Sequence, residues 1–348
     1  MTIVFFCRLF YPHIGGVEKH VMEIAKRLVS LGNKLIIITE SSLEVYSEGN
    51  KPILFEIIDN IEVYRIPVEK NESSKKWIIW RWMWKNKQIW HNADILHFHD
   101  VFFWYLPFRL LNLSKNAYIT FHGYEGYPLK KKAVLIRKLA EILTNGNICI
   151  GDFIKKWYGT KSTYVSYGAV NISKEKKVHQ PSPFSALFYG RLDNQTGITI
   201  YDAAMIIINK KYPQFSLTII GDGPLRDKID DKIRRFGYQI NISEYLKNNR
   251  FVFISSYLSI LEALAAKRLV FAVYDNPIKK DYLEMAPFAS FIIIENSHQK
   301  LAEKVAFFIK NPTLEAYKIE EGYKWVKNQT WDSVVKLYLK LWNKHNII

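Results

Sequence analysis

Short apolar runs alternate with amphipathic segments along the chain. Runs such as LIIIT and NICI are apolar almost throughout, which is typical of strands covered on both faces of a parallel sheet. Between the runs, Val21, Ile24, Ala25 and Leu28 share one face of a helix predicted over 17–31. The strands predicted in the first half are Ile3–Phe10, Lys34–Thr39, Ile61–Pro67, Ile95–His99, Tyr118–Phe121, Asn147–Ile150 and Thr163–Tyr167.

A polar stretch, Asn171–Pro183, interrupts this alternation, which then restarts. The stretch has charged residues and two prolines but no apolar period, so we interpret it as a linker between domains; a long surface loop is the alternative. The strands predicted after it are Ala186–Tyr189, Phe215–Ile220, Arg250–Ile254, Leu269–Val273 and Phe291–Ile294. The helices predicted after it are Gly197–Lys210, Leu225–Arg235, Ser259–Ala266, Ser297–Lys310, Pro312–Lys327 and Trp331–Trp342.

The pattern predicts an α/β protein of two Rossmann-like domains, each with a doubly wound parallel sheet that binds ligands beyond the carboxyl ends of its strands. We place the first domain at 1–170, the linker at 171–184, the second domain at 185–328 and a C-terminal helix at 329–348. Cys7 and Cys149 are the only cysteines, which excludes a disulfide framework; both lie in predicted strands, so we expect buried thiols. No apolar run is long enough to span a bilayer, and the first residues resemble a strand rather than a signal peptide, so we expect a cytoplasmic protein.

Basic residues are in excess, with 49 Lys and Arg against 33 Asp and Glu, and the formal net charge is +16. A field of that sign attracts nucleic acid, anionic lipid or phosphorylated substrates. Five of the ten tryptophans lie within 75–90 among basic residues, which is typical of a protein on the inner face of a membrane; core packing is the alternative. We expect no nucleic-acid partner, because the known binding motifs are absent. The candidates for membrane contact are Trp80, Arg81, Trp82, Trp84 and Lys85.

Two glycine turns that follow predicted strands are candidate anion sites. In YPHIGGVEKH, Gly15 and Gly16 precede a helix whose first amides favour phosphate or a sugar hydroxyl; a plain strand-to-helix turn is the alternative. Gly190 and Arg191 follow the strand ALFY, where a guanidinium can grip a diphosphate with two hydrogen bonds; a surface arginine is the alternative.

Glu262 and three histidines are the other candidates. Glu262 stands in an apolar helical pattern and needs a partner, either a ribose diol or a basic side chain. His97 and His99 share a strand face, and His122 ends another strand. Because no carboxylate or cysteine pattern accompanies them, we expect no metal site. His122 precedes Gly123, so we expect it in a cleft, where it can bond a substrate hydroxyl.

Taken in order, these motifs resemble those of the family 4 glycosyltransferases, a large retaining group of GT-B architecture. The resemblance spans nearly the whole chain and implies an N-terminal acceptor-side domain and a C-terminal nucleotide-sugar domain that face a central cleft. It also implies that the final helix crosses back to the first domain. The segments that carry it are FYPHIGGVEKHVMEIAKRLVSLGNKLIIIT, HFHD, ITFHG, SYGAV, ALFYGRLDNQTG, IIGDGPLRDKI and SILEALAAKRLVFA.

The resemblance implies transfer of a hexose from a nucleotide-diphosphate sugar to a glycan or lipid-linked acceptor. His122 would bond a hydroxyl of the transferred sugar, Arg191 would neutralise the leaving diphosphate, and Glu262 would hold the nucleotide ribose. The implied donor-binding residues are Gly15, Gly16, Gly190, Ser259 and Ile260. No Asp-x-Asp triplet occurs in the chain, so we expect cations and backbone amides in place of a metal, and no cofactor.

Two positions depart from the family pattern. Thr196 stands where a lysine is usual, and Ile254 where a glutamate is usual. These departures leave two alternatives to an active transferase: a weakened homologue that binds nucleotide sugar or another protein, and another GT-B enzyme such as a nucleotide-sugar epimerase. The residues that could replace the missing lysine are Lys155, Lys156, Lys267 and Arg268.

Overall fold

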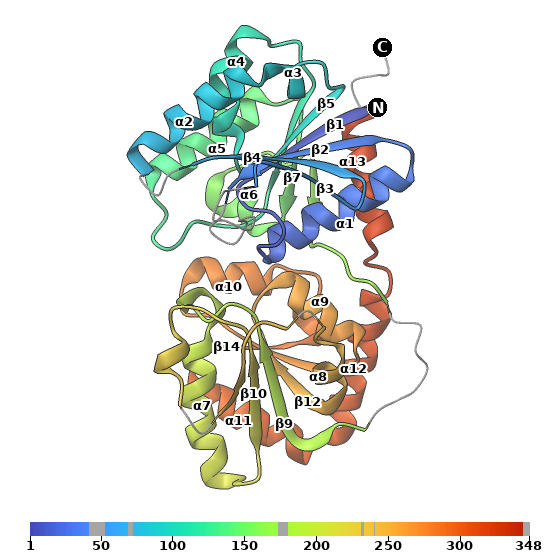
Figure 1. Cartoon of the computed structure of the whole chain (residues 1–348). Coiled ribbons are helices and arrows are strands. Elements are labelled where there is room, and N and C mark those ends of the chain that lie inside the picture. Colours follow the sequence, from blue (N-terminus) through green and yellow to red (C-terminus); the bar gives the residue numbers. More distant parts are fainter. Residues whose placement is uncertain (42–52, 69–71, 173–179, 231–232, 240, 344–348) are drawn as a thin grey trace. The chain divides into compact units, whose positions relative to one another are not determined.

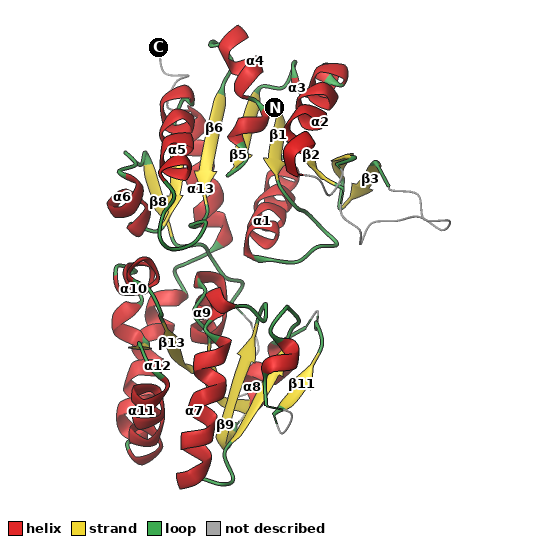
Figure 2. Ribbon diagram, turned by 90° about the vertical axis from the view of Figure 1, so that its left-hand side faces the viewer, coloured by secondary structure: helices red, strands yellow, loops and turns green. Residues whose placement is uncertain are grey.

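The computed structural model describes residues 1–348 except 42–52, 69–71, 173–179, 231–232, 240 and 344–348. Two compact units divide the chain, and each is built on its own sheet (Figure 1, Figure 2). Unit 1 comprises Met1–Ser166 and Trp331–Ile348, and unit 2 comprises Tyr167–Thr330. Part of the stretch that we interpret as a linker lies outside the described residues, and its last residues, from Ser182, already belong to a strand.

The sheet of unit 1 has eight strands in the order β3-β4-β2-β1-β5-β6-β7-β8. Neighbouring strands are parallel except for β3 with β4. Every strand predicted in this half is present, and the central ones are buried, as their apolar runs indicate. The strands are β1 (Thr2–Cys7), β2 (Lys34–Glu40), β3 (Phe55–Ile58), β4 (Ile61–Ile66), β5 (Ile95–His99), β6 (Ala117–Phe121), β7 (Asn147–Ile150) and β8 (Tyr164–Ser166).

The edge strand β3 is absent from the prediction. Its side chains Phe55 and Ile57 are exposed, so the segment lacks the buried run that marks the other strands. Asp59 and Asn60, which join β3 to β4, both have positive φ angles, as a two-residue hairpin turn requires. This Asp-Asn pair is the signal that could have revealed the hairpin.

Helix α1 (Gly16–Ser30) confirms the predicted apolar stripe, because Val21, Ile24 and Leu28 are buried. The tryptophan-rich segment forms two helices that meet at Asn86. The other helices of unit 1 are α2 (Glu72–Lys85), α3 (Lys87–Trp90), the 3-10 helix η1 (Phe102–Trp104), α4 (Leu106–Leu111), α5 (Lys131–Leu143), α6 (Phe153–Tyr158) and α13 (Trp331–Asn343).

The C-terminal helix α13 packs on unit 1, against α1 and the strand β8. Trp331 and Trp342 are about 1% exposed there. A tryptophan buries roughly 200 Å², so at about 25 cal/mol per Å² each stabilises this packing by about 5 kcal/mol. Gly146 allows the approach of Leu341, since a Cβ at Gly146 would lie 2.8 Å from the Leu341 Cδ1 atom.

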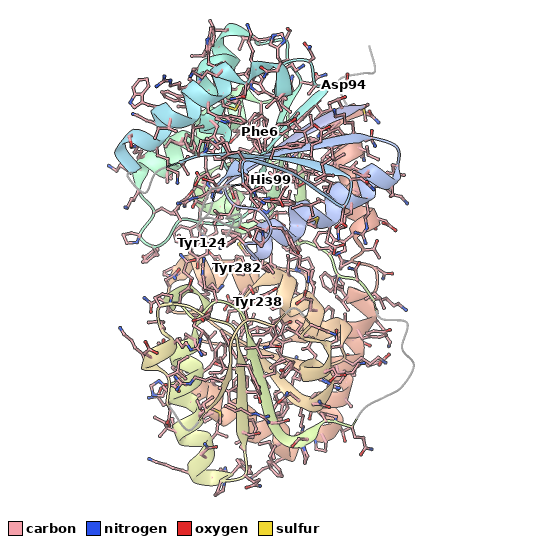
Figure 3. All side chains as sticks on the ribbon, in the orientation of Figure 1. Phe6, Asp94, His99, Tyr124, Tyr238 and Tyr282 are labelled. Atoms are coloured by element: carbon pink, nitrogen blue, oxygen red, sulfur yellow. The ribbon has the colours of Figure 1, made fainter. Side chains whose placement is uncertain are left out.

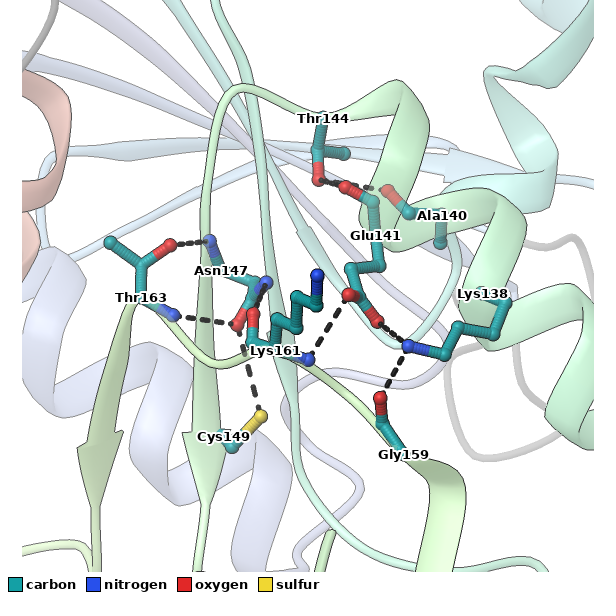
Figure 4. Close-up of polar contacts among 9 residues, drawn as sticks. All are labelled: Lys138, Ala140, Glu141, Thr144, Asn147, Cys149, Gly159, Lys161 and Thr163. Atoms are coloured by element: carbon teal, nitrogen blue, oxygen red, sulfur yellow. Dashed lines mark hydrogen bonds and ion pairs between the residues drawn. The ribbon is translucent and has the colours of Figure 1, made fainter. Parts of the chain in front are cut away.

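Asn147 attaches the edge strand β8 to β7 (Figure 4). Its side-chain oxygen accepts from the Thr163 amide at 3.2 Å, and its side-chain nitrogen donates to the Lys161 carbonyl at 3.1 Å. Glu141 of α5 accepts from the Lys161 amide at 3.0 Å. Cys149 lies beside this network and, like Cys7, is a buried free thiol, as predicted.

The sheet of unit 2 is parallel, in the order β11-β10-β9-β12-β13-β14. Phe188, Ile219, Phe253 and Phe271 belong to its buried core. The strands are β9 (Ser182–Tyr189), β10 (Ser216–Ile220), β11 (Arg234–Phe236), β12 (Asn249–Phe253), β13 (Leu269–Val273) and β14 (Ile293–Glu295). The helices are α7 (Ile198–Lys211), α8 (Ser243–Asn248), α9 (Tyr257–Ala265), α10 (Pro277–Glu284), α11 (His298–Lys310), α12 (Pro312–Val326) and the 3-10 helices η2 (Asn194–Thr196), η3 (Arg226–Lys228) and η4 (Ala289–Phe291).

The helix predicted over Leu225–Arg235 is wrong. Leu225, Ile229 and Ile233 have helical spacing, but in the described part of this segment, which omits 231 and 232, the one helical turn is η3. The chain becomes extended at Ile229, with ψ of 143°, and then pairs as β11 with β10. Three apolar residues cannot bury enough surface to hold a helix there against this pairing.

Candidate functional site

Each sheet has one point where the order of strands reverses, between β1 and β5 in unit 1 and between β9 and β12 in unit 2. Doubly wound sheets bind ligands at such points, beyond the carboxyl ends of the strands. Gly15 and Gly16 follow β1, and Arg191 follows β9. Glu262 lies on α9, which follows β12.

The glycine turn of unit 1 holds a buried carboxylate. Gly15 is the N-cap of α1 and offers no side chain to the first amides of the helix. A Cβ at Gly15 would lie 2.4 Å from the Glu18 Oε2 atom. Glu18 is 7% exposed, and its Oε1 atom is 3.2 Å from His13 Nδ1. A phosphate at this helix end would meet that carboxylate, so the geometry favours a neutral sugar hydroxyl over an anion.

A chain of hydrogen bonds connects α13 to the strands β5 and β6 and to α1. Trp342 Nε1 donates to His97 Nδ1 at 3.1 Å, so the proton of His97 is on Nε2, which lies 2.8 Å from Thr120 Oγ1. Thr120 Oγ1 lies 2.8 Å from the Tyr338 hydroxyl, which lies 2.9 Å from His20 Nε2. Every hydroxyl proton is used if Thr120 donates to Tyr338 and Tyr338 donates to His20.

Burial keeps four histidines of unit 1 neutral, namely His20 and His97 of this network and the neighbouring His99 and His122. It lowers the pKa of His20 to about 3 and lowers the pKa of His97, His99 and His122 well below 6.5. Among the described residues, no group of three or more His, Cys, Asp or Glu is arranged to hold a metal ion.

His99 and His122 form a separate pair, with His99 Nδ1 2.8 Å from His122 Nε2 (His99 is labelled in Figure 3). The Nε2 atom of His99 is buried without a partner in the described part of the chain. A buried lone pair costs less than a buried N–H without an acceptor, so His99 Nδ1 donates to His122. His122 then carries its proton on Nδ1, where it can donate to a ligand. Sequence reasoning found His122 but not this orientation by His99.

Two polar groups fix the turn that carries His122. The His122 amide donates to the Asp100 carboxylate at 3.1 Å. Arg137 of α5 bonds Glu125 at 3.0 Å, and its guanidinium lies 4.1 Å from the centre of the Tyr158 ring. Asp100 ends the HFHD segment, whereas Glu125, Arg137 and Tyr158 stand in none of the quoted motifs.

Two loops of unit 2 lie against each other at the carboxyl ends of β9 and β10. The Gly190 amide donates to the Ile220 carbonyl at 3.0 Å, and the Leu192 amide donates to the Asp222 carbonyl at 2.8 Å. Gly221 has φ of +132°, and a Cβ there would lie 2.0 Å from the Gly190 carbonyl oxygen. Only glycine allows this contact.

Arg191 projects from this pair of loops with its side chain 66% exposed. Its Nε atom donates to Asp193, which also accepts from the Gln195 and Thr196 amides at 2.9 and 3.2 Å. Asp193 therefore orients the guanidinium and begins the turn η2. The remaining N–H groups of Arg191 are placed to reach an anion beyond β9.

Helix α9 brings Glu262 and the amides of its first turn to the carboxyl end of the sheet, the end from which Arg191 projects. Tyr189, the last residue of β9, donates its hydroxyl to the Ser259 carbonyl at 2.7 Å. Burial and the nearby Glu262 carboxylate raise the pKa of Tyr189 well above 10, so the hydroxyl stays protonated. Sequence reasoning missed Tyr189. The Ile260 amide, one of the two predicted donors, is already bonded to the Ser256 carbonyl at 2.9 Å, which leaves the Ser259 amide for a ligand.

The two departures from the family pattern have different surroundings. Ile254 is buried beside β13, with its amide bonded to the Phe271 carbonyl at 3.1 Å. Thr196 donates its hydroxyl to the Asp193 carbonyl at 2.8 Å. Lys267 pairs with Glu320 at 3.2 Å and Arg268 bonds carbonyls of α8, both beyond the carboxyl end of α9. The remaining suggested substitutes, Lys155 and Lys156, belong to unit 1.

The tryptophan-rich helix α2 is exposed along one face. Trp77 and Trp84 are 62% and 61% exposed, while Trp80 and Trp82 are partly buried. Trp80 donates to the Phe103 carbonyl at 3.0 Å, so it packs on the fold. Of the residues predicted for membrane contact, Trp80 and Trp82 are thus partly buried, and Trp77, which the prediction leaves out, is exposed. Arg81 and Lys85 are exposed, as expected.

A polar hollow of about 580 Å³ occupies another part of unit 2. It lies by the amino ends of β9, β10 and β12, and none of the predicted donor residues lines it. The hollow is therefore a different feature from the loops at the carboxyl ends.

No helix among the described residues is both long and apolar enough to cross a membrane.

Comparison with known proteins agrees with this arrangement. Residues 14–162 match the family described as Glycosyltransferase Family 4, and residues 170–325 match Glycosyl transferases group 1. One component of the human phosphatidylinositol N-acetylglucosaminyltransferase is 23% identical over 385 positions, which cover 97% of this chain and 75% of that protein. An uncharacterized glycosyltransferase of Methanocaldococcus jannaschii is 24% identical, with 94% of each chain covered.

Solved structures show the same fold at lower identity. Sucrose-phosphate synthase from Thermosynechococcus elongatus has a TM-score of 0.75 at 13% identity, with 99% of both chains covered. The Anabaena protein HepE, solved with UDP and glucose, has a TM-score of 0.73 at 14% identity, with 98% of this chain and 99% of that chain covered. At such identities the likeness shows the fold alone.

The buried imidazoles predict how the stability of unit 1 depends on pH. The folded pKa of His20 is about 3 against 6.5 for an ordinary histidine, so below pH 6.5 the unfolded chain binds more protons. The stability is full above pH 6.5 and falls by about 1.4 kcal/mol per pH unit for each such imidazole as the pH drops toward 3. His20→Gln keeps an acceptor for Tyr338 and should make this decline less steep by about one proton.

Urea unfolding at several pH values, followed by tryptophan fluorescence, measures this slope. Nine of the ten tryptophans lie in unit 1, so the signal reports mainly on that unit. His91→Gln, at an exposed position, is the matched control. Equal slopes for wild type and His20→Gln would show that the buried imidazole does not carry the effect.

Proposed function

Since the chain belongs to the family 4 glycosyltransferases of GT-B architecture, we propose that it is a retaining, metal-independent hexosyltransferase whose donor is a nucleotide-diphosphate sugar bound by unit 2. The observation that carries the proposal is that Arg191, the first turn of α9 and Glu262 all belong to segments that follow the two strands at the reversal, β9 and β12, and that Tyr189 of β9 bonds Ser259 of α9. A diphosphate needs cations and N–H donors, and a ribose diol needs an acceptor for two hydroxyl groups. These are the groups that the two loops and α9 supply.

In the proposed reaction, the bond between the anomeric carbon and the diphosphate oxygen breaks as a bond to the acceptor hydroxyl oxygen forms. The nucleoside diphosphate leaves with the electron pair, and the acceptor hydroxyl loses its proton. Arg191 and the Ser259 amide stabilise the negative charge that grows on the leaving group. His122 of unit 1, with its proton on Nδ1, is assigned as a donor to a sugar hydroxyl.

The turn at Gly15 and Gly16 has its own part in the proposal. Because the Glu18 carboxylate occupies its surroundings, we assign this turn to sugar hydroxyl groups rather than to the donor phosphate. The α9 segment LEALA, which contains the proposed ribose acceptor Glu262, favours a transferase over a nucleotide-sugar epimerase. A weakened homologue that binds nucleotide sugar without turnover is the remaining alternative, since Thr196 and Ile254 both lack a charge.

Donor binding and turnover test the proposal together. Titration calorimetry with UDP, GDP and ADP should find one diphosphate that binds, and the matching nucleotide sugar should be turned over. Arg191→Gln should weaken the diphosphate about tenfold and slow turnover about 100-fold, because it removes a charge-assisted donor to the leaving group. Glu262→Gln should weaken both nucleoside and diphosphate, because it removes a ribose acceptor.

Matched variants control this experiment. Arg234→Gln and Glu303→Gln remove exposed charges elsewhere in unit 2 and should change neither quantity. Binding without turnover would favour the weakened homologue, and absence of binding to any nucleoside diphosphate would reject the assignment of unit 2.

We also propose that the acceptor is lipid-linked and lies at an anionic membrane surface. The name of the human relative gives phosphatidylinositol as part of its substrate. In this chain, Trp77 and Trp84 are exposed on α2, with Lys76 and Lys87 at 5.4 and 5.7 Å from their ring centres. Helices α2, α4 and α5 all contact η1. The exposed apolar residues of α4 and α5 are Leu110, Leu111, Leu135, Ile136, Leu139 and Ile142.

Vesicle sedimentation tests the membrane surface. The protein should bind phosphatidylglycerol vesicles at low salt and bind less as salt rises, since the attraction to anionic lipid is screened. Trp77→Ser with Trp84→Ser should lower the partition coefficient about tenfold, while Tyr317→Ser, an exposed aromatic residue of unit 2, should not change it. If wild type ignores anionic vesicles at low salt, the membrane proposal fails while donor binding stands.

A further inference from the structure

One buried lysine of unit 2 has no role in the function proposed so far. Lys279, on α10, is 7% exposed, although a lysine is seldom buried without an acidic partner. Among the described residues, no carboxylate lies within ion-pair distance of its ammonium group. Its Nζ donates to the Ser255 carbonyl at 2.5 Å and lies 4.3 Å from the centre of the Tyr282 ring, which Figure 3 labels. An ammonium group has three N–H donors, so these contacts leave at least one of them unused.

The fold places this ammonium group at the strand reversal. Ser255 lies between the end of β12 and Ser256, the N-cap of α9. The Ser255 side chain is also held, with its oxygen 2.8 Å from the Tyr201 hydroxyl and 2.9 Å from the Val273 amide. Asn276 caps α10 by accepting from the Lys279 amide at 2.9 Å, which fixes the turn on which the lysine stands. The ammonium group is therefore immobilised beside the first turn of α9.

The charges around Lys279 belong to the same loops. Burial lowers its pKa to about 8, and Asp275 and Asp193 oppose this shift. Asp193 is the residue that orients Arg191. Thr196, where the family resemblance implies a lysine, is the last residue of η2. This 3-10 helix begins directly after Asp193 and ends before Gly197. A Cβ at Gly197 would lie 2.3 Å from Val273 at the end of β13, so η2 packs against the strand that leads into α10.

We propose that Lys279 supplies the second cation for the donor diphosphate, because position 196, where the family resemblance implies a lysine, holds Thr196. The inference rests on the proposed donor site of unit 2. Arg191 projects from the loop after β9, and Lys279 stands on α10, which follows β13. The phosphates are therefore held by cations from two segments that follow strands of the sheet. A buried ammonium group is less hydrated than an exposed one, and its unused N–H is available to a phosphate oxygen at little desolvation cost.

Lys279→Met, which keeps the length of the side chain and removes its charge, tests the inference. The ligands are the nucleoside diphosphate that wild type binds best among UDP, GDP and ADP, and the matching nucleoside. The variant should bind the diphosphate about tenfold more weakly and the nucleoside unchanged. Lys280→Met is the matched control, because the next residue of α10 is half exposed, pairs with Glu284 at 3.8 Å and should leave both affinities unchanged.

The pair of ligands separates a phosphate contact from a structural role. If Lys279 only held the Ser255 turn, its loss would weaken nucleoside and diphosphate alike, and that result would overturn the inference, as would unchanged binding of the diphosphate. Lys279→Arg, which keeps a cation, should recover part of the diphosphate affinity. Thermal unfolding checks that each variant is folded, and Lys279→Gln serves if Lys279→Met is not. If wild type binds none of the three diphosphates, the donor site itself is wrong.

Discussion

A contact between two backbones determines what unit 2 can bind. The carbonyl oxygen of Gly190 occupies the space that a Cβ on Gly221 would need, at 2.0 Å from that position. The contact joins the loops after β9 and β10 into one rigid edge. Arg191 projects from this edge, and α9 meets it through the bond from Tyr189 to Ser259. Groups fixed in this way need little reorganisation when charge appears on a leaving group, which is the main means by which such sites accelerate transfer.

In unit 1, burial fixes the protonation state of histidine side chains. Burial keeps His20 and His97 neutral, and a chain of hydrogen bonds joins α13 to β5, β6 and α1 through them. A neutral imidazole with a fixed tautomer donates from one nitrogen and accepts at the other, whereas a protonated one would donate from both and accept at neither. The C-terminal helix therefore supports the orientation of the residues around His122, although it comes last in the sequence.

The sequence predicted the two-domain α/β fold well, because buried parallel strands leave apolar runs that can be recognised without context. The comparisons confirm the GT-B fold and the family. Local patterns failed where tertiary pairing decided the outcome, as at Leu225–Arg235, where spacing suggested a helix and pairing with β10 produced β11. The candidate residues at strand ends, such as Arg191, stood in motifs. Lys279 and Tyr189 did not, because their importance comes from elements that meet only in the folded chain.

The central claim is that unit 2 binds a nucleoside diphosphate at the carboxyl ends of β9 and β12. Amide hydrogen exchange with and without the bound diphosphate measures this directly, because backbone amides that donate to phosphate exchange more slowly. The account predicts slower exchange in the turns 190–196 and 221–226 and in the first turn of α9, 256–260. Protection confined to the hollow by Ser182, Ser216 and Asn249, with none in these three segments, would contradict it.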